Sequence, residues 1–393
     1  MMVLALVFPA SANQWQIEVV DTCGSWAKLQ LKTAPDGVVH LLYCDGNLVL
    51  HHAYKDSLWH HEVVDTFPSL AGWDMDLGSH NELGLALDFR NGSVGLLVRQ
   101  DAGWVMDSVP ITAASWDALL SWDSAGNPAV AYVKSKGVVG FAGRSDSGWV
   151  CDTITIDPTG SVYVRGLVHD AQDDPCVMVW YNYSQGNVVL QYTRQDTSWL
   201  EQTVDAPTWR GSVQPRATAR DPGGMAAVCD NWTDYYGSGG VGFRYATVNV
   251  KSSIEDSTQV QVAALAISAT GERHVTYLDQ NTSGPLKHAC YTGSGWTKDT
   301  VLNGNISLLG GIDFLDELPV IAFYEPGAGI CVASMLPSGV ADQPQTTRNG
   351  LRVSTIVRGV LFLPEATSHK PQATSCLIDI GGRKVMDFGA RCE

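Results

Sequence analysis

The sequence repeats a tryptophan-led strand at nearly constant intervals along most of its length. The first two copies read WQIEVVDT and WHHEVVDT. Segments of this kind begin at Trp15, Trp59, Trp104, Trp149, Trp199 and Trp296. The intervals between them are 44, 45, 45, 50 and 97 residues, so the last interval holds two units, with one tryptophan lost near 248–250. Such a period indicates one structural unit copied along the chain, because each copy buries its apolar face only against its neighbours.

Each unit holds four short strands. About 22 residues after the tryptophan comes a turn followed by an apolar strand, as in DGVVHLLYCD, GNPAVAYVK and GERHVTYLD. A third strand then leads to the next tryptophan through a tight hairpin such as KDSLW or SDSGW, whose Asp, Gly and Ser residues suit such turns. Four strands in about 45 residues are typical of the blades of a propeller.

Counting the segments predicts the number of blades. Seven tryptophan-type segments and seven sets of the other three strands are present. The repeats begin with a lone outermost strand at Trp15 and end with GICVASML, a third strand without a fourth. We therefore predict an all-β fold, a seven-bladed β-propeller over residues 13–340, in which the N-terminal strand completes the last blade. This closure hides strand edges that would otherwise pair with other chains.

The two flanking segments differ in character from the repeats. Residues 1–12 are apolar and end in Ala10-Ser11-Ala12, a pattern that predicts the remnant of a signal peptide and an exported protein. The alternative is an apolar segment that packs against the fold. Residues 341–393 begin with a polar linker and continue into a predicted short β tail.

Two parts of the chain resemble known families. The hairpins SDSGW and QDAGW resemble the BNR or Asp-box repeat, Ser-x-Asp-x-Gly-x-x-Trp, with two residues fewer before the tryptophan. The wider repeat is similar to those of secreted bacterial propeller proteins. Leu377–Phe388, LIDIGGRKVMDF, resembles the C-terminal sorting domain of the type IX secretion system without its Gly-Val-Tyr ending. These resemblances imply a secreted or surface protein with a truncated sorting domain; an ordinary hairpin is the alternative at the C-terminus.

Composition excludes several partners and cofactors. The net charge of −16 argues against binding to nucleic acid or to an anionic membrane surface, because both require a basic face. No apolar run approaches the roughly 18 residues of a membrane span. The nine cysteines form no C-x-x-C pair, so the sequence predicts no zinc ribbon. In a chain of this length we also expect no disulfide framework. We expect no cofactor.

The segment WHHEVVDT raises the question of a metal site. A hairpin turning near Asp56 would set His52 opposite His60 and His51 opposite His61. Each pair would offer two ligands, whereas a structural zinc site takes four. The histidines also occupy positions that vary among the repeats. We therefore interpret them as part of the blade framework and predict no metal site.

The loops on one face of the predicted ring are the candidate ligand site, because loops on a rigid scaffold carry function. The longest of them, DNWTDYYGSGG, combines flat aromatic rings with hydrogen-bonding groups, as a sugar requires. WYNYSQGN in the preceding unit has a similar composition, and further residues enter the same face between blades. The predicted ligand-binding residues are Trp116, Arg165, Trp180, Tyr183, Arg216, Trp232, Asp234, Tyr235 and Tyr236. The alternative for each aromatic residue is packing between blades.

The sequence predicts no catalytic residues. A polysaccharide lyase could use His40 with Tyr43 or His274 with Tyr277, but both pairs occupy the repeated second-strand position and indicate framework. No hydrolase, zinc-protease or phosphate-loop motif occurs. The leading hypothesis is a secreted or surface module that binds carbohydrate or a partner protein. A glycan-active enzyme, either a lyase or a sialidase-like glycosidase, and a structural surface or filament subunit are the alternatives.

Overall fold

The computed structural model describes residues 15–22, 25–45, 47–111, 116–156, 159–183, 186–206, 212–221, 224–232, 241–255, 260, 262–278 and 284–336, and four short strands beyond them. The chain divides into two compact units, Met1–Pro337 and Ser338–Glu393. No helix in the described part of the chain is long and apolar enough to span a membrane.

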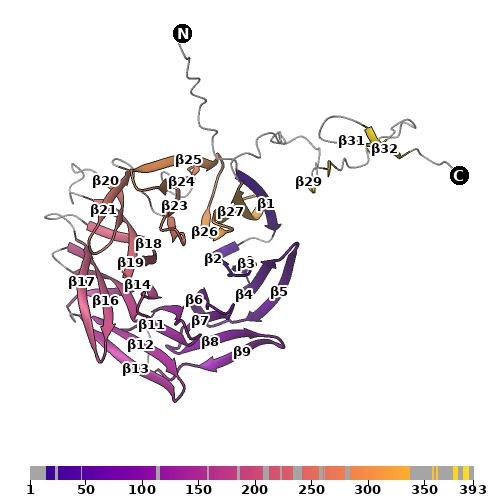
Figure 1. Cartoon of the computed structure of the whole chain (residues 1–393). Helices are drawn as coiled ribbons and strands as arrows, with labels where there is room; N and C mark the ends of the chain where they lie inside the picture. Colours follow the sequence, from indigo (N-terminus) through magenta and orange to yellow (C-terminus); the bar gives the residue numbers. More distant parts are fainter. Residues whose placement is uncertain are drawn as a thin grey trace, which may run out of the picture. The chain divides into compact units, whose positions relative to one another are not determined.

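The first unit is a seven-bladed propeller of four-stranded antiparallel sheets, as predicted. Figure 1 shows these sheets around a central opening, with β2, β6, β14 and β26 among the strands nearest to it. Blades 1 to 3 consist of β2 Ser25–Thr33, β3 Val39–Asp45, β4 Val49–Lys55, β5 Trp59–Thr66, β6 Leu70–Leu77, β7 Leu83–Phe89, β8 Val94–Gln100, β9 Gly103–Ser108, β10 Trp116–Trp122, β11 Pro128–Ser135, β12 Val138–Ser145 and β13 Gly148–Thr155.

The remaining blades follow the same order. Blades 4 to 6 consist of β14 Ser161–His169, β15 Pro175–Tyr183, β16 Gly186–Gln195, β17 Ser198–Asp205, β18 Ser212–Asp221, β19 Gly224–Trp232, β20 Val241–Ala246, β21 Lys251–Glu255, β22 Ala263–Ile267, β23 Arg273–Leu278, β24 Leu286–Tyr291 and β25 Trp296–Leu302. Blade 7 consists of β26 Leu308–Leu315, β27 Leu318–Glu325, β28 Gly329–Met335 and β1 Trp15–Asp21.

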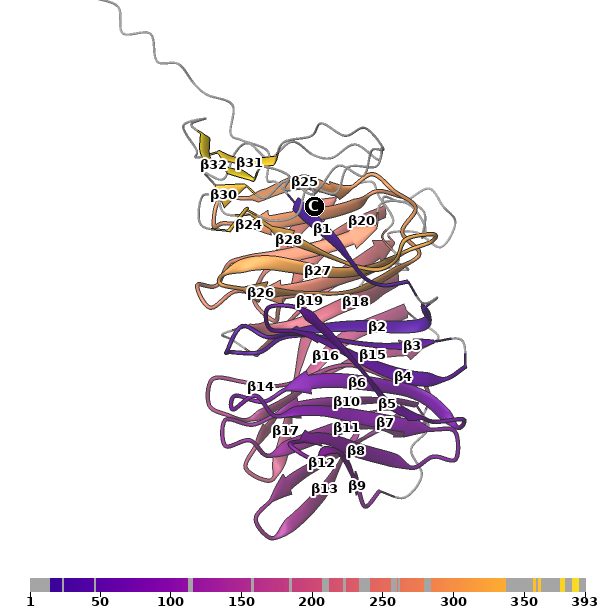
Figure 2. The same cartoon turned by 90° about the vertical axis from the view of Figure 1, so that its right-hand side faces the viewer.

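The N-terminal strand closes the ring, which confirms the prediction from the strand count. β1 pairs antiparallel with β28, with Trp15 opposite Met335, and becomes the outermost strand of blade 7. Figure 2 shows β1 beside β28 in a view onto the side of the ring. The first and last repeats are thereby joined through backbone hydrogen bonds, and the last blade is not left one strand short.

The core is divided into seven apolar clusters, one between each pair of neighbouring blades. Second strands such as β3 and β7 are buried over six consecutive residues, because both of their faces pack against a neighbouring sheet. Outermost strands such as β5 are mostly exposed. Each blade therefore obtains its stability from its neighbours rather than from a core of its own.

The repeated tryptophan also joins neighbouring blades through its indole N–H. In three cases it donates to a carboxylate of the preceding blade, located three residues after that blade's own tryptophan. These bonds run from Trp104 to Glu62 at 3.1 Å, from Trp199 to Asp152 at 3.0 Å and from Trp15 to Asp299 at 2.8 Å. The motif W-x-x-[D/E] thus supplies the donor to one neighbour and the acceptor to the other.

In four blades a cation on the third strand reaches the carboxylate at the [D/E] position of this motif in the preceding blade. The pairs are Lys55 with Glu18, Arg99 with Glu62, Arg144 with Asp107 and Arg194 with Asp152. In blade 5, Lys251 lies opposite Ala246, as Lys298 lies opposite Ala289 in blade 6, and its Nζ is 2.8 Å from Asp205 of blade 4. The residue at the tryptophan position of blade 5 is Asn249, because Ser252, three residues later, accepts the indole N–H of Trp296 from blade 6 at 2.9 Å.

The second unit contains the strands β29 Ile356–Val357, β30 Val360–Leu361, β31 Ser375–Ile378 and β32 Lys384–Phe388. β31 pairs antiparallel with β32, with Leu377 opposite Met386. The segment that resembles a sorting domain therefore forms a strand pair, and its role in sorting stays a prediction.

The hydrogen bond of Trp15 can be tested against a tryptophan that lacks one. Trp15→Phe removes the donor to Asp299, whereas the indole N–H of Trp149 is buried without a partner among the described residues. We expect Trp15→Phe to lower the free energy of unfolding by about 2 kcal/mol more than Trp149→Phe, because a hydrogen bond to a charged group contributes roughly that amount. Calorimetric melting of both variants measures the difference; equal losses would contradict the role assigned to this bond.

Candidate functional site

The central channel of the propeller unit forms a cavity. Its volume is about 670 Å³, and its wall includes residues from the innermost strand of every blade. This volume lies within the range of roughly 300–1,000 Å³ that is usual for ligand pockets. The polar wall residues include Lys28, Gln30, Lys32, Asp74, Asp76, Asp117, Ser121, Arg165, His169, Arg216, Thr218, Arg220 and Asp313. A channel with so many charged groups suits a polar ligand.

β-bulges direct several of these side chains into the channel. We call the end at which the chain enters the innermost strands the upper mouth. Register shifts occur near this mouth in β10 between Trp116 and Leu119, in β14 between Val164 and Gly166 and in β18 between Pro215 and Ala217. A bulge adds one residue to a strand and redirects its side chain. Asp117, Arg165 and Arg216 lie within these three shifts, and all three line the channel.

Arg165 is held between aromatic rings and a carboxylate. Its guanidinium lies 5.1 Å from the ring centre of Tyr163 and 5.6 Å from that of Trp180, and Nη1 is 3.7 Å from Asp117. Burial lowers the pKa of Arg165, Asp117 opposes this effect, and the nearby Arg216 adds to it. The Nε–H of Arg165 is buried without a hydrogen-bond partner among the described residues. A ligand acceptor at this mouth would satisfy a donor that the protein leaves unpaired.

Asp74 of blade 2 adds a further carboxylate to the channel wall. Asp74 accepts hydrogen bonds from Gln30 at 2.6 Å and from the backbone N–H of Leu120 at 3.0 Å, which link three consecutive blades. Lys28 donates to the carbonyl of Trp73. Burial lowers the pKa of Lys28, although Asp74 and Asp117 oppose this effect. From blade 1 to blade 5, the upper mouth therefore carries a cation (Lys28), two carboxylates (Asp74 and Asp117) and two further cations (Arg165 and Arg216).

Asp117 has an unusual backbone conformation. Its φ of 59° lies in the left-handed region, which costs energy for a residue other than glycine. Its N–H is bonded to Asp88, a buried carboxyl whose pKa is raised to about 6 by burial and by the charge of Asp117. The surrounding structure thus holds Asp117 in a strained position from which its carboxylate faces the channel, and such strain is concentrated at functional sites.

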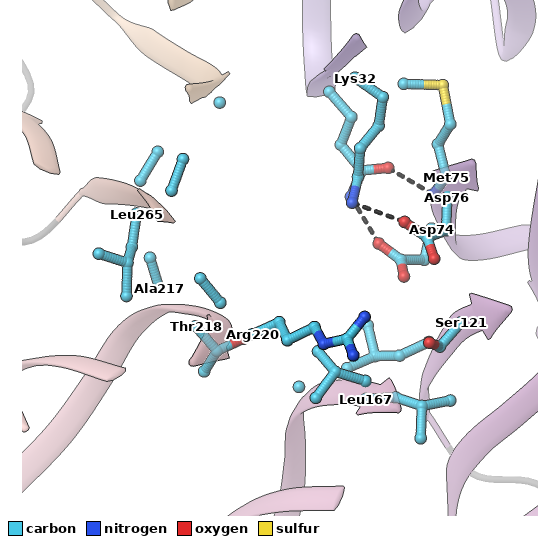
Figure 3. A pocket seen from close by; sticks show the side chains of 18 of the residues that line it. Lys32, Asp74, Met75, Asp76, Ser121, Leu167, Ala217, Thr218, Arg220 and Leu265 are labelled. Atoms are coloured by element: carbon cyan, nitrogen blue, oxygen red, sulfur yellow. Dashed lines mark hydrogen bonds and ion pairs between the residues drawn. The ribbon is translucent and has the colours of Figure 1, made fainter. Parts of the chain in front are cut away.

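The lower part of the channel contains an ion pair between two wall residues and a carboxylate bonded to the backbone. Lys32 Nζ lies 2.6 Å from Asp76, and Asp313 accepts a hydrogen bond from the backbone of Thr33 at 2.7 Å. Burial alone would lower the pKa of Lys32, but Asp76 and Asp313 outweigh it and the pKa is raised. Figure 3 shows the Lys32–Asp76 pair on one side of the cavity and Arg220 pointing into it from the other. The lower groups are therefore largely paired with each other.

The residues predicted to bind ligand have different positions. Arg165 and Arg216 line the channel, while Trp180 packs between blades and donates its indole N–H to the carbonyl of Val213 in blade 5 at 2.9 Å. Trp116, Tyr183 and Trp232 lie at ends of β10, β15 and β19, and their side chains are outside the description. Asp234, Tyr235 and Tyr236 lie wholly outside the described residues.

Sequence reasoning missed most of the channel wall. Lys28, Lys32, Asp74 and Asp76 were not predicted, although they alternate with apolar residues in AKLQLK and WDMDL. Side chains on alternate residues of a strand share one face, so charges at every second position of an innermost strand indicate a polar channel. That pattern could have identified the wall; the bulges could not be found from the sequence.

The predicted pairing of the histidine hairpin was wrong by two residues. His52 lies opposite Glu62 and His51 opposite Val63, whereas His60 lies opposite Tyr54. The turn is centred on Ser57 rather than on Asp56, because the Asp56 carboxylate accepts the backbone N–H groups of Ser57 and Leu58. A shift of two residues keeps each side chain on its predicted face.

The histidines are joined into a buried chain of hydrogen bonds. His40 Nδ1 lies 3.0 Å from His52 Nε2, and His52 Nδ1 lies 2.7 Å from Glu62. Blade 6 repeats this arrangement with His274, His288 and Asp299, at 3.0 and 2.8 Å. The tyrosines of the two pairs considered for lyase chemistry donate to other carboxylates, Tyr43 to Asp21 and Tyr277 to Glu255. A contact repeated in two blades is what a framework role predicts.

The comparisons with known proteins identify the fold. Neither a protein-family model nor a curated protein matches the sequence. BBS1N in complex with ARL6DN is similar at a TM-score of 0.51 and 10% identity, covering 84% of this chain and 97% of that one. A chain of the Mitotic Checkpoint Complex is similar at 0.52 and 13%, covering 86% and 99%. The fucose-recognising lectin of Aleuria aurantia, a six-bladed propeller, scores 0.47 at 14%, covering 70% and 94%. At these identities the likenesses to BBS1N and the Mitotic Checkpoint Complex chain show the fold alone, and the strand topology defines the protein as a seven-bladed β-propeller.

The histidine chain of blade 1 predicts a dependence of stability on pH. Burial, with smaller contributions from His52 and Arg99, lowers the pKa of His40 to about 4, while Asp36 and Glu62 oppose this effect. Between pH 6.5 and 4 the unfolded chain therefore binds a proton that the folded protein does not. The stability that His40 contributes is fully present above pH 6.5 and falls by about 3 kcal/mol as the pH decreases toward 4.

Urea denaturation across this pH range checks the prediction. We expect His40→Gln to have a flatter dependence than the wild type. His60→Gln removes a partly exposed histidine of the same blade, and this control should keep the wild-type slope. A His40→Gln slope equal to that of the control would contradict the prediction.

Proposed function

We propose that the protein is a binding module that takes a carbohydrate at the upper mouth of its channel. The observation that carries the proposal is the position of Arg165, which is stacked on two aromatic rings, faces Asp117 and keeps a buried donor unpaired. A sugar hydroxyl both donates and accepts, so neighbouring cationic donors and carboxylate acceptors complement it. Because polar groups of the site are unsatisfied without such a ligand, the site favours hydroxylated ligands over apolar ones.

The shape of the site also supports a small polar ligand. A cavity of about 670 Å³ accommodates a short saccharide, whereas a partner protein requires several hundred Å² of surface outside the channel. The strained backbone of Asp117 and the stacking of Arg165 hold both groups in place before a ligand arrives. Such preorganisation reduces the entropic cost of binding.

The proposal extends to the place of action. A secreted or surface location is supported by the cleavage pattern Ala10-Ser11-Ala12 and by the resemblance of the hairpins to BNR repeats. The resemblance of Leu377–Phe388 to a sorting domain supports the same location. Secretion of the full-length protein by its source cells, measured in the culture medium and on the cell surface, tests this part.

A glycan array followed by calorimetry tests the ligand site. We expect Arg165→Gln to weaken binding of the best glycan by roughly tenfold to a hundredfold, because a charged hydrogen bond contributes about 1.5–3 kcal/mol. Arg144→Gln is the matched control: Arg144 also pairs with a carboxylate and lies over a tryptophan, but on the outer hairpin of blade 3.

The outcomes of this experiment separate the alternatives. Binding that weakens only in Arg165→Gln supports the proposal. Equal loss in both variants, or no glycan binding by the wild type, contradicts it. Shortened or unsaturated glycans detected by mass spectrometry after incubation would instead identify a glycan-active enzyme.

A further inference from the structure

Blade 6 carries three potential metal ligands in addition to its histidine chain. Among the described residues, the donor atoms of Glu272, His274 and Cys290 lie within 4.8 Å of one another. His274 Nε2 is 3.5 Å from Cys290 Sγ and 3.7 Å from a carboxylate oxygen of Glu272. His274 is buried, Cys290 is half-buried and Glu272 is exposed, so the cluster opens to solvent on one side.

The geometry points to a zinc site. A tetrahedral zinc ion with nitrogen at about 2.0 Å and sulfur at about 2.3 Å holds these two atoms about 3.5 Å apart. The observed separation of His274 Nε2 and Cys290 Sγ is 3.5 Å. A set of nitrogen, sulfur and oxygen donors favours Zn²⁺ over Mg²⁺ or Ca²⁺, which prefer oxygen ligands. We propose that Glu272, His274 and Cys290 bind one Zn²⁺ and leave a fourth position open to water or to an external ligand.

The histidine chain orients His274 for this role. The Asp299 carboxylate only accepts, so a neutral His288 donates from Nδ1 to Asp299 and accepts at Nε2. His274 then donates from Nδ1 to His288, and its Nε2 retains a lone pair directed at the cluster. A ligating histidine usually donates its other N–H to such a partner, which fixes the orientation of the ring. Trp15, bonded to Asp299, fixes the far end of the chain.

Blade 1 contains the same chain without the additional ligands. The turns before His40 and His274 have the same form, with Gly37 at φ 87° and Gly271 at φ 85°. The position two residues before the first histidine is Val38 in blade 1 and Glu272 in blade 6. The histidine chain therefore belongs to the framework, and what distinguishes blade 6 is the pair of ligands placed around its free nitrogen.

The position of Cys290 also differs between the two blades. Two residues after the second histidine, blade 1 has Tyr54 where blade 6 has Cys290, and the Tyr54 ring lies beside His40 and His52. In the metal-free protein the Cys290 thiol can donate to His274 Nε2. Zinc replaces that proton, so the thiol loses H⁺ to solvent and a Zn–S bond forms.

Titration of the full-length protein with Co²⁺ under anaerobic conditions, after treatment with a chelator, tests the site. A cobalt–thiolate bond absorbs in the near ultraviolet, and we expect this absorption to saturate at one equivalent and to disappear when Zn²⁺ is added. Cys290→Ser should abolish it, and Glu272→Gln should weaken Co²⁺ binding at least tenfold. If Cys290→Ser does not fold, Glu272→Gln tests the site at an exposed position.

Two variants serve as matched controls. Cys151→Ser removes an exposed cysteine of blade 3, and His40→Gln breaks the histidine chain of blade 1 without changing the cluster. Both should keep the wild-type absorption and stoichiometry. Zn²⁺ should also raise the melting temperature of the wild type but not that of Cys290→Ser.

Each outcome of the cobalt titrations either supports the proposed zinc site or overturns it. Absorption lost in Cys290→Ser and retained in both controls supports the site. Absence of the thiolate absorption in the wild type, its survival in Cys290→Ser or its loss in His40→Gln would each overturn the proposal. Cobalt bound without that absorption would be assigned to the exposed histidines of blade 1. Because the cluster is in blade 6, these results do not depend on glycan binding at Arg165.

Discussion

The contact between neighbouring blades is the constraint on which the rest of the structure depends. Each four-stranded sheet presents apolar residues on both faces, and each face is covered only when the next blade is in place. The tryptophan N–H and the carboxylate of W-x-x-[D/E] add a directional bond to this non-directional packing. Because every blade needs two neighbours, the first and last must meet, and β1 meets this requirement by pairing with β28.

Closure of the ring also creates the channel and its chemistry. Seven innermost strands bring charged residues from segments far apart in the sequence to one cavity, where bonds between blades satisfy most of them. Gln30, Asp74 and the backbone of Leu120 connect three blades in this way. Towards the upper mouth the pairing is incomplete, as the unpaired Nε–H of Arg165 indicates. A buried donor left unpaired reduces stability, and a ligand that accepts from it recovers that energy.

Repetition allows one blade to serve as the reference for another. The histidine–histidine–carboxylate chain occurs in blades 1 and 6 with nearly the same distances, which assigns the chain itself to the framework. Because the two blades share this scaffold, the residues that differ around the histidine chain indicate what is particular to each blade. Tyr54 covers the chain in blade 1, whereas Cys290 and Glu272 surround a free ring nitrogen in blade 6. Folding of the blade does not require Cys290 and Glu272 around this nitrogen, because blade 1 folds without them.

Local patterns determined the fold of this protein. The interval between tryptophans, the alternation along the outermost strands and the unpaired strands at the two ends of the repeats predicted seven blades and their closure. Each depends only on residues close in sequence, or on counting. Tertiary structure decided what enters the channel, because the bulges at Asp117, Arg165 and Arg216 result from how β10, β14 and β18 fit against their neighbours. It also decided which side chains meet across strands. The turn is centred on Ser57 beside Asp56, so His52 lies opposite Glu62. The pairing of β23 with β24 places His274 beside Cys290, sixteen residues later in the sequence.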